Sequence, residues 1–273
     1  MEVLKIFKLK EKSGIRYYII EELAKTGLVD HCFTTKIGGV SKGDYQSLNM
    51  GQHVDDDLEK VNENRRRVGS ILKADLKDMV AAKQIHDNKV YIVSDKDKGR
   101  GALDYKGAIE EIDALITNKR GILLSSYYAD CTPIILLDPK KKVVGLAHAG
   151  WKGTVKKIGE KTVIKMSEVY GSNPEDIIAG IGPTIGPCCY QVDERVVGPL
   201  SEELDYWKEV VEEDEEARWR LNLSLANKKG LEKVGVGSII ESKLCTSCYS
   251  ELFFSYRRDG GRTGRMASLI KLK

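Results

Sequence analysis

Along most of the chain, apolar residues alternate with polar ones or gather in short runs, and this pattern predicts many short strands. The first pair reads as an N-terminal hairpin at about residues 1–20, closed by the turn KEKSG. Short apolar runs bounded by Gly, Pro, Asp or Lys are typical of buried strands. They recur at 31–35, 79–82, 90–93, 114–117, 122–127, 134–137, 143–147, 177–181, 252–256 and 266–272.

Fewer segments have the spacing of helices. Residues 55–74 carry acids first and bases later around an apolar face, which predicts a helix aligned with its own dipole. A second helix is expected over 153–170, with Gly171 as its C-cap. The heavily charged residues 193–235 are predicted to be mostly helical. Because strands and helices alternate irregularly, we expect a mixed α/β (α+β) fold, a layered sandwich of mixed β-sheets flanked by helices.

Composition adds limits to this picture. The 273 residues include only 6 prolines and no Gly/Ser-rich linker, so one domain over residues 1–273 is expected. The formal net charge of +3 is too small and too dispersed to indicate binding to nucleic acid or membranes. The N-terminus lacks the apolar core of a signal peptide, and no segment suits a bilayer. We therefore expect a cytoplasmic protein, monomeric or weakly dimeric, with six reduced cysteines.

Three candidate metal ligands lie next to predicted strands. His86 ends MVAAKQIH, Cys131 lies between two apolar runs in YYADCTPIILLD, and His148 ends VVGLAH. If these strand ends meet at one sheet edge, two imidazoles and a thiolate could bind zinc and leave a fourth position for water or substrate. Asp87 and Asp130 could orient the ligands. Each ligand alone is also consistent with ordinary packing, so the spacing by itself leaves both interpretations open.

The other histidines and cysteines give weaker signals. His31 and His53 flank a long polar loop and are interpreted as ordinary loop histidines. Cys245 and Cys248 have the spacing of a zinc knuckle, but no second pair is apparent. The cysteines at 188–189 are adjacent, which is poor geometry for chelating one ion together. An independent structural zinc site, which needs four nitrogen or sulfur ligands, is therefore not favoured.

Seven sequence blocks resemble a known family. They are FTTKIGGVSKGDYQSLNMG, KQIH, DALIT, ADCTPIILLD, HAGWKGT, GPTIGPCCYQV and SYRRDGGRTGRMASLI. In this order, from about residue 31 to the C-terminus, they closely resemble the YfiH/YlmD-type family, once called multicopper polyphenol oxidases or laccase-domain proteins. The resemblance implies a YfiH-like zinc-dependent purine nucleoside phosphorylase for adenosine, inosine and methylthioadenosine that also deaminates adenosine. It implies that His86, Cys131 and His148 hold the single catalytic zinc, for which copper could substitute in vitro.

The implied reaction also needs a site for inorganic phosphate. Guanidinium groups bind phosphate in a planar, bidentate manner. The segment SYRRDGGRTGR contains four arginines, of which Arg257 and Arg258 are favoured, although a basic turn can simply be solvated. Arg65 in the first predicted helix is a second candidate. Lys36 stands where this family commonly has arginine; it keeps the charge but loses the bidentate fork.

Further polar and aromatic residues fall in the matching blocks. Asn49 and Gln84 could bind ribose hydroxyls or base edges, or could simply cap a loop. Trp151 could stack on a purine, or could be a core residue beneath a helix start. Gly150 and Gly153 are expected to let the backbone approach the substrate.

The sequence is consistent with several functions. Deamination would need a metal-activated water and a proton shuttle, for which Asp130 is the candidate, because the His-x-Glu signature of known zinc deaminases is missing. A zinc amidase that edits peptidoglycan precursors fits the same resemblance. A metal-free hydrolase with Cys131 as nucleophile and His148 as base is another alternative, as is a non-catalytic binding module. A multicopper oxidase is rejected, since four histidines are too few for several copper sites.

Overall fold

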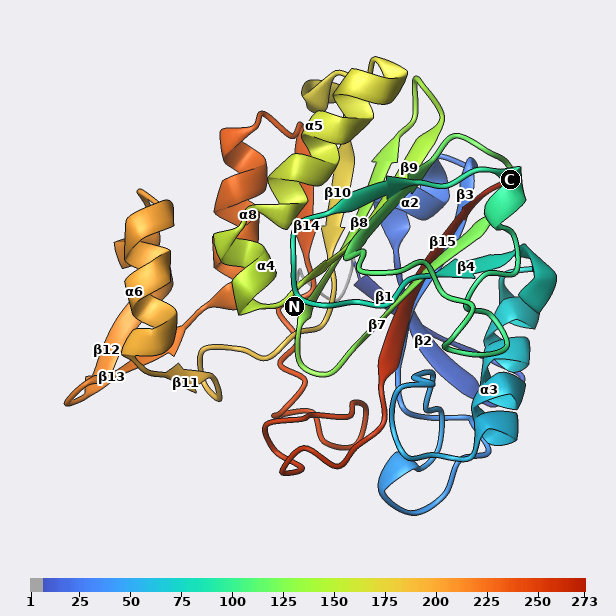
Figure 1. Ribbon diagram of the computed structural model, residues 1–273, viewed down its shortest axis with the longest axis horizontal. Helices are drawn as coiled ribbons and strands as arrows, with labels where there is room; N and C mark the ends of the chain where they lie inside the picture. The colour runs from blue at the N-terminus through green and yellow to red at the C-terminus, as the bar shows by residue number, and fades with distance from the viewer. Residues whose placement is uncertain (1–6) are drawn as a thin grey trace.

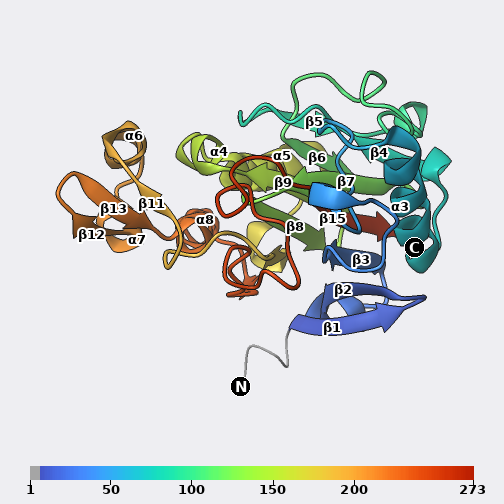
Figure 2. The same ribbon diagram turned by 90° about the horizontal axis from the view of Figure 1, so that it is seen from below.

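The computed structural model describes residues 7–273, and two six-stranded sheets form its centre (Figures 1 and 2). The first sheet contains β1 (Phe7–Lys12), β2 (Ile15–Ile20), β3 (Val29–Thr34), β4 (Met79–Ala81), β7 (Leu123–Tyr128) and β15 (Met266–Leu272). The second contains β5 (Val90–Ile92), β6 (Ala114–Thr117), β8 (Thr132–Asp138), β9 (Val143–Ala149), β10 (Ile178–Ile181) and β14 (Ser238–Glu241). Their strand orders are β1-β2-β3-β15-β7-β4 and β14-β10-β8-β9-β6-β5. Both sheets mix parallel and antiparallel pairs.

The two sheets pack face to face, and helices cover their outer faces (Figure 2). Apolar side chains of both sheets, such as Leu124 and Leu146, fill the space between them. The longer helices are α3 (Leu58–Ile71), α5 (Ile158–Tyr170) and α8 (Leu223–Lys233). The C-terminal part of α3 packs on the first sheet, and α5 and α8 pack on the second. Strands β8 and β9 are buried along their whole length, which explains why they read as nearly continuous apolar runs.

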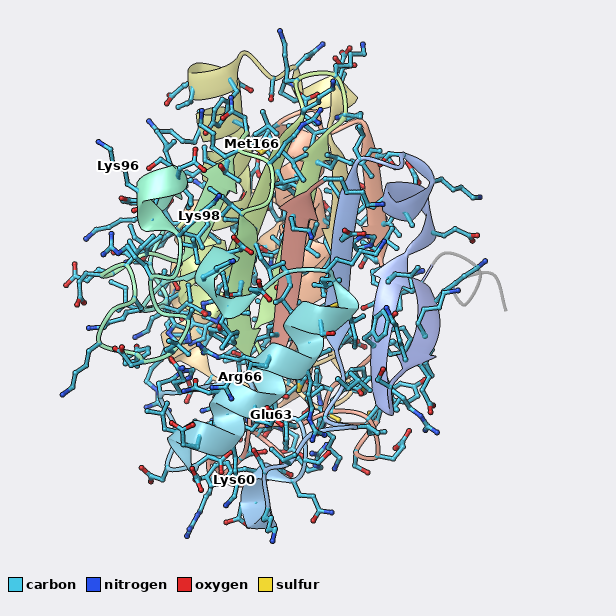
Figure 3. The ribbon with its side chains drawn as sticks, turned by 90° about the vertical axis from the view of Figure 1, so that its right-hand side faces the viewer. Lys60, Glu63, Arg66, Lys96, Lys98 and Met166 are labelled. Atoms are coloured by element: carbon cyan, nitrogen blue, oxygen red, sulfur yellow. The ribbon has the colours of Figure 1, made fainter. Side chains whose placement is uncertain are left out.

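The outer face of α3 shows the opposite composition. Lys60, Glu63 and Arg66 project from this helix into solvent (Figure 3). Asp57 caps the helix by accepting a hydrogen bond from the backbone N–H of Glu59 at 3.0 Å. The helix therefore has the predicted arrangement, with one buried face and one charged face.

A smaller lobe extends from one end of the second sheet (Figure 1, orange elements at left). It contains a three-stranded sheet of order β11-β13-β12. Its elements are α6 (Glu194–Glu203), α7 (Trp207–Val210), β11 (Gln191–Val192), β12 (Val211–Glu215) and β13 (Arg218–Leu221). With α4 (Trp151–Val155) and α8 they enclose their own apolar cluster. The prediction that 193–235 is mostly helical was therefore wrong for β12 and β13. The residues of β12 are almost all exposed, so this strand lacks the apolar alternation that would have identified it.

Other predictions need smaller corrections. The helix expected over 153–170 is two helices, α4 and α5, because Lys157 between them has φ = 62°, in the left-handed region. Residues 252–256 form turns and loop, not a strand. The predicted hairpin is confirmed over β1 and β2, and its first six residues lie outside the described part. The remaining short elements are α2 (Glu21–Lys25), η1 (Gly43–Tyr45), η2 (Leu76–Asp78), η3 (Asp95–Asp97) and η4 (Pro174–Asp176).

The expected fold class is confirmed: this is a mixed α+β fold of layered mixed sheets with few helices. Among the described residues, no helix is both long and apolar enough to cross a membrane.

Candidate active site

Three side chains that can bind a metal meet at one end of the second sheet. The ligand atoms of His86, Cys131 and His148 all lie within 4.8 Å of one another. Cys131 directly precedes β8, and His148 lies near the end of β9. Because these strands pair antiparallel, with Pro133 opposite His148, the start of one lies beside the end of the other. His86 comes from the loop after β4, and its ring centroid is 4.8 Å from that of His148.

The carboxylate of Asp113 orders two of these three ligands. Its Oδ1 lies 2.9 Å from Nδ1 of His148, which leaves Nε2 of that buried ring for a metal. The same carboxylate accepts hydrogen bonds from the backbone N–H groups of Ile85, His86 and Asp87 at 2.9–3.1 Å. These bonds hold His86 in the left-handed region, at φ = 62°. Asp113 thus fixes the orientation of His148, as carboxylate partners do for histidines that bind metals.

Asp113 was not among the carboxylates predicted to orient the ligands. Asp87 and Asp130 were predicted for this role, because each directly neighbours a candidate ligand in the chain. Asp113 instead directly precedes β6, within the family block that begins DALIT, and it is 35 residues from His148. The sequence did contain a signal for Asp113: an acidic residue directly before the apolar run of β6, which is fully buried. A buried carboxylate needs hydrogen-bond donors, so such a residue is expected to have specific partners.

The electrostatics of this group favour a thiolate. Burial by itself would raise the pKa of the Cys131 thiol, but His148 and His86 outweigh burial and lower this pKa to about 6. Burial would lower the pKa of His148, yet Cys131 and Asp113 raise it to about 9. A thiolate is the form of cysteine that binds metals, so the group is suited to a soft or borderline cation.

Two nitrogens and one sulfur fit zinc with a fourth position left open, which is the donor count of a catalytic site. The adjacent Gly150 makes room for these ligands. A Cβ atom at this position would lie 2.8 Å from both the Cys131 Sγ and the His86 Cδ2. The glycine was expected to make space for substrate; in the structure it makes space for the ligands. At Gly153, a Cβ atom would lie 3.3 Å from Cγ2 of Ile158, so this glycine allows close packing against the start of α5.

A cavity of about 590 Å³ opens beside the three ligands. Among the described residues its lining contains three cations, and Asp130 is its one carboxylate. The guanidinium of Arg257 lies 5.1 Å from the ring centroid of Tyr190, and that of Arg265 lies 5.6 Å from that of Tyr256. The cavity therefore combines aromatic faces with excess positive charge. Its aromatic and cationic lining residues are Tyr105, Tyr127, Tyr128, Trp151, Tyr190, Tyr256, Lys152, Arg257 and Arg265.

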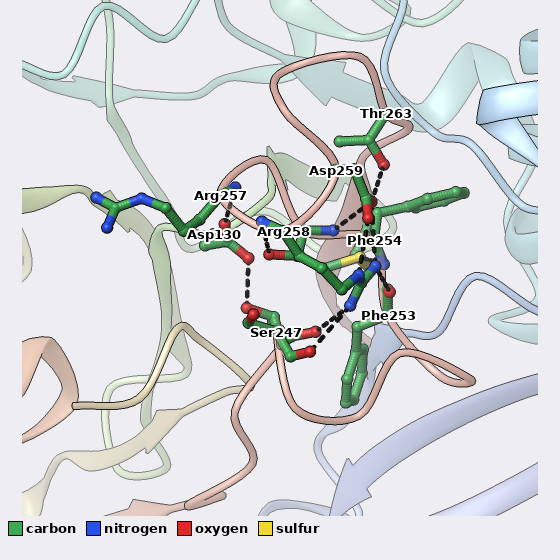
Figure 4. A network of polar contacts seen from close by, with 11 residues as sticks. Asp130, Ser247, Phe253, Phe254, Arg257, Arg258, Asp259 and Thr263 are labelled. Atoms are coloured by element: carbon green, nitrogen blue, oxygen red, sulfur yellow. Dashed lines mark hydrogen bonds and ion pairs between the residues drawn. The ribbon is translucent and has the colours of Figure 1, made fainter. Parts of the chain in front are cut away.

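Both carboxylate oxygens of Asp130 accept hydrogen bonds (Figure 4). Oδ1 accepts from the hydroxyl of Thr246 at 2.6 Å, and Oδ2 accepts from the backbone N–H of Arg257 at 2.9 Å. Asp130, which directly precedes Cys131, thus links this part of the chain with the basic segment SYRRDGGRTGR. Through this link the carboxylate helps to place Arg257 at the cavity.

The two favoured arginines have different environments. Arg257 lines the cavity, and its Nη1 donates to the backbone oxygen of Gln191 at 2.9 Å. Arg258 extends away from it into a separate network with Asp259 and backbone oxygens (Figure 4). It borders a second, shallower hollow of about 720 Å³ that Lys36 also lines. Lys36 and Arg258 are therefore not in the lining of the cavity beside the ligands.

Arg65 is also outside that lining. It is fully buried in α3, and its Nε donates to the backbone oxygen of Met50 at 2.9 Å. Its Nη1 donates to the oxygens of Gly101 and Ala102 at 2.7 and 2.9 Å, and the guanidinium lies 4.3 Å from the ring centroid of Tyr127. These contacts make Arg65 a buried link between two loops.

The two candidate amides are engaged with the protein. Asn49 is buried, and its Oδ1 accepts from the backbone N–H of Arg265 at 2.9 Å, so it positions a cavity arginine. Gln84 lines the cavity, but its amide exchanges two hydrogen bonds of 2.8 Å with the backbone of Tyr127. Trp151, at the start of α4, lines the cavity and also packs against the apolar cluster of the lobe.

Of the two histidines interpreted as ordinary loop residues, His31 is not in a loop, and His53 is in a loop but lines the cavity. His31 lies in β3, where its Nε2 accepts a hydrogen bond from the backbone N–H of Ile20 at 2.8 Å. His53 lines the cavity, with its ring centroid 5.7 Å from that of Tyr105. Arg265 and Tyr190, which sequence reasoning did not select, line it too. Both lie in family blocks, but only the fold brings them to the ligands.

Comparisons with known proteins identify the same family as the sequence blocks. A family model described as multi-copper polyphenol oxidoreductase laccase matches residues 30–273. "Purine nucleoside phosphorylase YlmD" of Bacillus subtilis is 43% identical over 248 residues, which cover 88% of this chain and 87% of that protein. "Adenosine deaminase RL5" of an unknown prokaryotic organism is 32% identical over 237 residues, covering 85% and 90%. The crystal structure of Bacillus licheniformis hypothetical protein YfiH matches with a TM-score of 0.93 and 41% identity, covering 98% and 99%.

Proposed function

Because the chain belongs to the multi-copper polyphenol oxidoreductase laccase family, and is similar to proteins named purine nucleoside phosphorylase and adenosine deaminase, we propose that it is a zinc-dependent purine nucleoside phosphorylase that also deaminates adenosine. The observation that carries this proposal is one cavity lined by His86, Cys131 and His148 together with two arginines and several aromatic rings. This cavity has groups for a metal, an anion and a flat heterocycle.

His86, Cys131 and His148 would hold the zinc, with Asp113 fixing the tautomer of His148. Zinc bound there would supply a Lewis acid at an open coordination position. Copper could occupy the same three ligands in vitro. The donor count supports one catalytic ion and gives no basis for the several copper sites of a multicopper oxidase.

Phosphorolysis requires phosphate to attack C1′ of the ribose while the purine leaves. Arg257 and Arg265 supply guanidinium groups to the cavity, and Lys152 adds a third cation. These groups would bind the phosphate dianion and orient it toward C1′. Trp151 and Tyr190 offer aromatic faces for the purine of adenosine, inosine or methylthioadenosine.

Deamination requires a group that moves a proton between water and the leaving ammonia. Asp130 lies in the cavity lining next to Cys131 and is the carboxylate available there. Its two hydrogen bonds, from the Thr246 hydroxyl and the Arg257 backbone N–H, hold the carboxylate in place beside Cys131. We propose Asp130 for this role.

The test is to incubate the purified protein with adenosine, with and without phosphate, and to separate the products by liquid chromatography. Phosphate-dependent adenine that disappears in a His86→Ala variant supports phosphorolysis at this site. Inosine formed without phosphate, and lost in the same variant, supports deamination. Absence of both products would overturn the nucleoside proposal.

Two alternatives predict different results in parallel assays. An amidase acting on peptidoglycan precursors would release an amino acid from such a precursor and leave nucleosides unchanged. A metal-free hydrolase would retain activity in protein without zinc and would lose it on alkylation of Cys131. Metal analysis of the active fraction separates this alternative from the proposed function.

A further inference from the structure

A second group of metal-binding side chains lies outside the active site. The sulfur atoms of Cys188, Cys189, Cys245 and Cys248, here called the four-cysteine cluster, all lie within 4.8 Å of one another. The Sγ of Cys248 is 3.4 Å from the Sγ of both Cys188 and Cys189. All four are free thiols. The sequence interpretation treated the two pairs as separate and the adjacent cysteines as poor partners, and the fold brings all four sulfurs together.

The sheet topology explains this meeting. Strands β10 and β14 are parallel neighbours, so the loops that follow them leave the same sheet edge. The pairing continues beyond the strands as a parallel bridge between Thr184 and Cys245. The backbone N–H of Thr246 donates to the oxygen of Thr184 at 3.0 Å. The loop carrying Cys188 and Cys189 is therefore held against the turn Cys-Thr-Ser-Cys.

The spacing of the sulfurs fits one tetrahedral ion. With zinc–sulfur bonds of about 2.3 Å, four thiolates around zinc lie about 3.8 Å apart. The sulfur contacts of 3.4 Å, and the limit of 4.8 Å for the whole group, lie on either side of that value. Tetrahedral sets of four thiolates are typical of zinc or iron.

Neighbouring groups contact the cluster and leave space for its sulfurs. The backbone N–H of Gly186 donates to the Cys245 Sγ at 3.2 Å, as amides around metal-bound sulfur do. A Cβ atom on Gly186 would lie 3.2 Å from the Cys188 Sγ, so the glycine leaves space for the sulfurs. Nη1 of Arg220 donates to the backbone oxygen of Cys188 at 3.0 Å.

Arg258 fixes the other side of the cluster. Its Nη1 donates to the backbone oxygens of Thr246 and Ser247 at 3.0 and 3.2 Å, inside the Cys-Thr-Ser-Cys turn (Figure 4). Core packing does not explain the grouping, because Cys188 and Cys248 are exposed. Cysteine is among the most buried residue types, so two exposed thiols beside two others need another reason.

We propose that the four-cysteine cluster is a second metal site, which binds one zinc ion through four thiolates. Because all four positions are filled by protein, this zinc is structural. It joins the loop after β10 to the loop after β14. The cluster is independent of the proposed catalytic function and stands if that function fails.

The test measures bound zinc per chain in the purified full-length protein. We expect two zinc ions in the wild type, one in a His86→Ala/His148→Ala variant and one in a Cys245→Ser/Cys248→Ser variant. The matched control is Cys32→Ala, which removes a buried cysteine that belongs to neither group and should keep two ions. Zinc X-ray absorption of the double-histidine variant should give a shell of four sulfurs.

The double-histidine variant leaves the cluster intact, so it decides the question even if the double-serine variant does not fold. No zinc in that variant, or a shell with nitrogen or oxygen, overturns the proposal. Two zinc ions retained in the double-serine variant overturn it as well. Iron with thiolate-to-iron absorption at the cluster would overturn the assignment to zinc.

Discussion

The two groups of metal-binding side chains differ in donors and in framework. The active-site group has two imidazoles and one sulfur and borders a cavity, whereas the four-cysteine cluster offers four sulfurs. Cys131 and His148 stand at the ends of two fully buried strands, while the cluster belongs to loops. Two ligands at the ends of buried strands and one from a loop leave a coordination position for chemistry, whereas four ligands on loops would fill the coordination sphere. The number of donors thus separates a site suited to catalysis from one suited to stability.

The two groups are also connected. Thr246 lies between Cys245 and Cys248, and its hydroxyl donates to the Asp130 carboxylate at 2.6 Å. Asp130 directly precedes Cys131 and also holds the backbone of Arg257. Direct hydrogen bonds therefore join the cluster loop to the lining of the cavity.

The largest expected effect comes from Cys131→Ala. Without this sulfur only two ligands remain, so the active-site zinc should be lost and both nucleoside reactions should fall more than about 100-fold. The cluster should keep its ion, which metal analysis would show. Cys32→Ala is the control for removal of a buried thiol. Wild-type turnover in a Cys131→Ala variant that has lost only the active-site ion would contradict the division of roles between the two groups.

Asp113→Asn tests the support behind the active-site ligands. The amide keeps the shape but loses the charge that attracts Nδ1–H of His148, so activity or zinc affinity should fall about 10- to 100-fold. The measurement is a zinc titration combined with steady-state kinetics. Asp97→Asn is a matched control, because Asp97 is a buried carboxylate that bonds Ser94 and Tyr91. An equal loss in both variants would mean that Asp113 acts only on stability.

Arg257→Gln tests the anion side of the cavity. Loss of a charge-assisted hydrogen bond costs about 1.5–3 kcal/mol, so the KM for phosphate should rise about 10- to 100-fold. Arg262→Gln is the control from the same loop, because Arg262 is exposed and paired with Asp44. Steady-state kinetics with phosphate as the varied substrate would decide. A phosphate KM unchanged in Arg257→Gln would remove this residue from the phosphate site.

Arg258→Ala should have the smallest effect on catalysis and act on stability instead. Its hydrogen bonds to three backbone oxygens would be lost, lowering the free energy of unfolding by about 2–3 kcal/mol. Thermal unfolding with and without added zinc would measure this, with Arg262→Ala as control. A large rise in the phosphate KM without loss of stability would place Arg258 in the binding site after all.

How much the sequence revealed depended on the range of the interactions. Strands β8 and β9 were predictable because both of their faces are buried, so local composition reports their environment. The predicted metal ligands follow from the family resemblance together with their positions at strand ends. Arg257 and Arg258 could not be distinguished in sequence, because adjacent residues project in different directions.

The sequence by itself determined the fold class and the family, and its family blocks contain the three side chains that meet as a group able to bind a metal. Only the tertiary structure showed that Asp113 supports His148 and that the two cysteine pairs form one cluster. Cys188 and Cys248 are 60 positions apart, and their meeting depends on the parallel pairing of β10 with β14. Contacts of this kind leave no periodic pattern in the chain, since they arise only when separate strands pair and bring their following loops together.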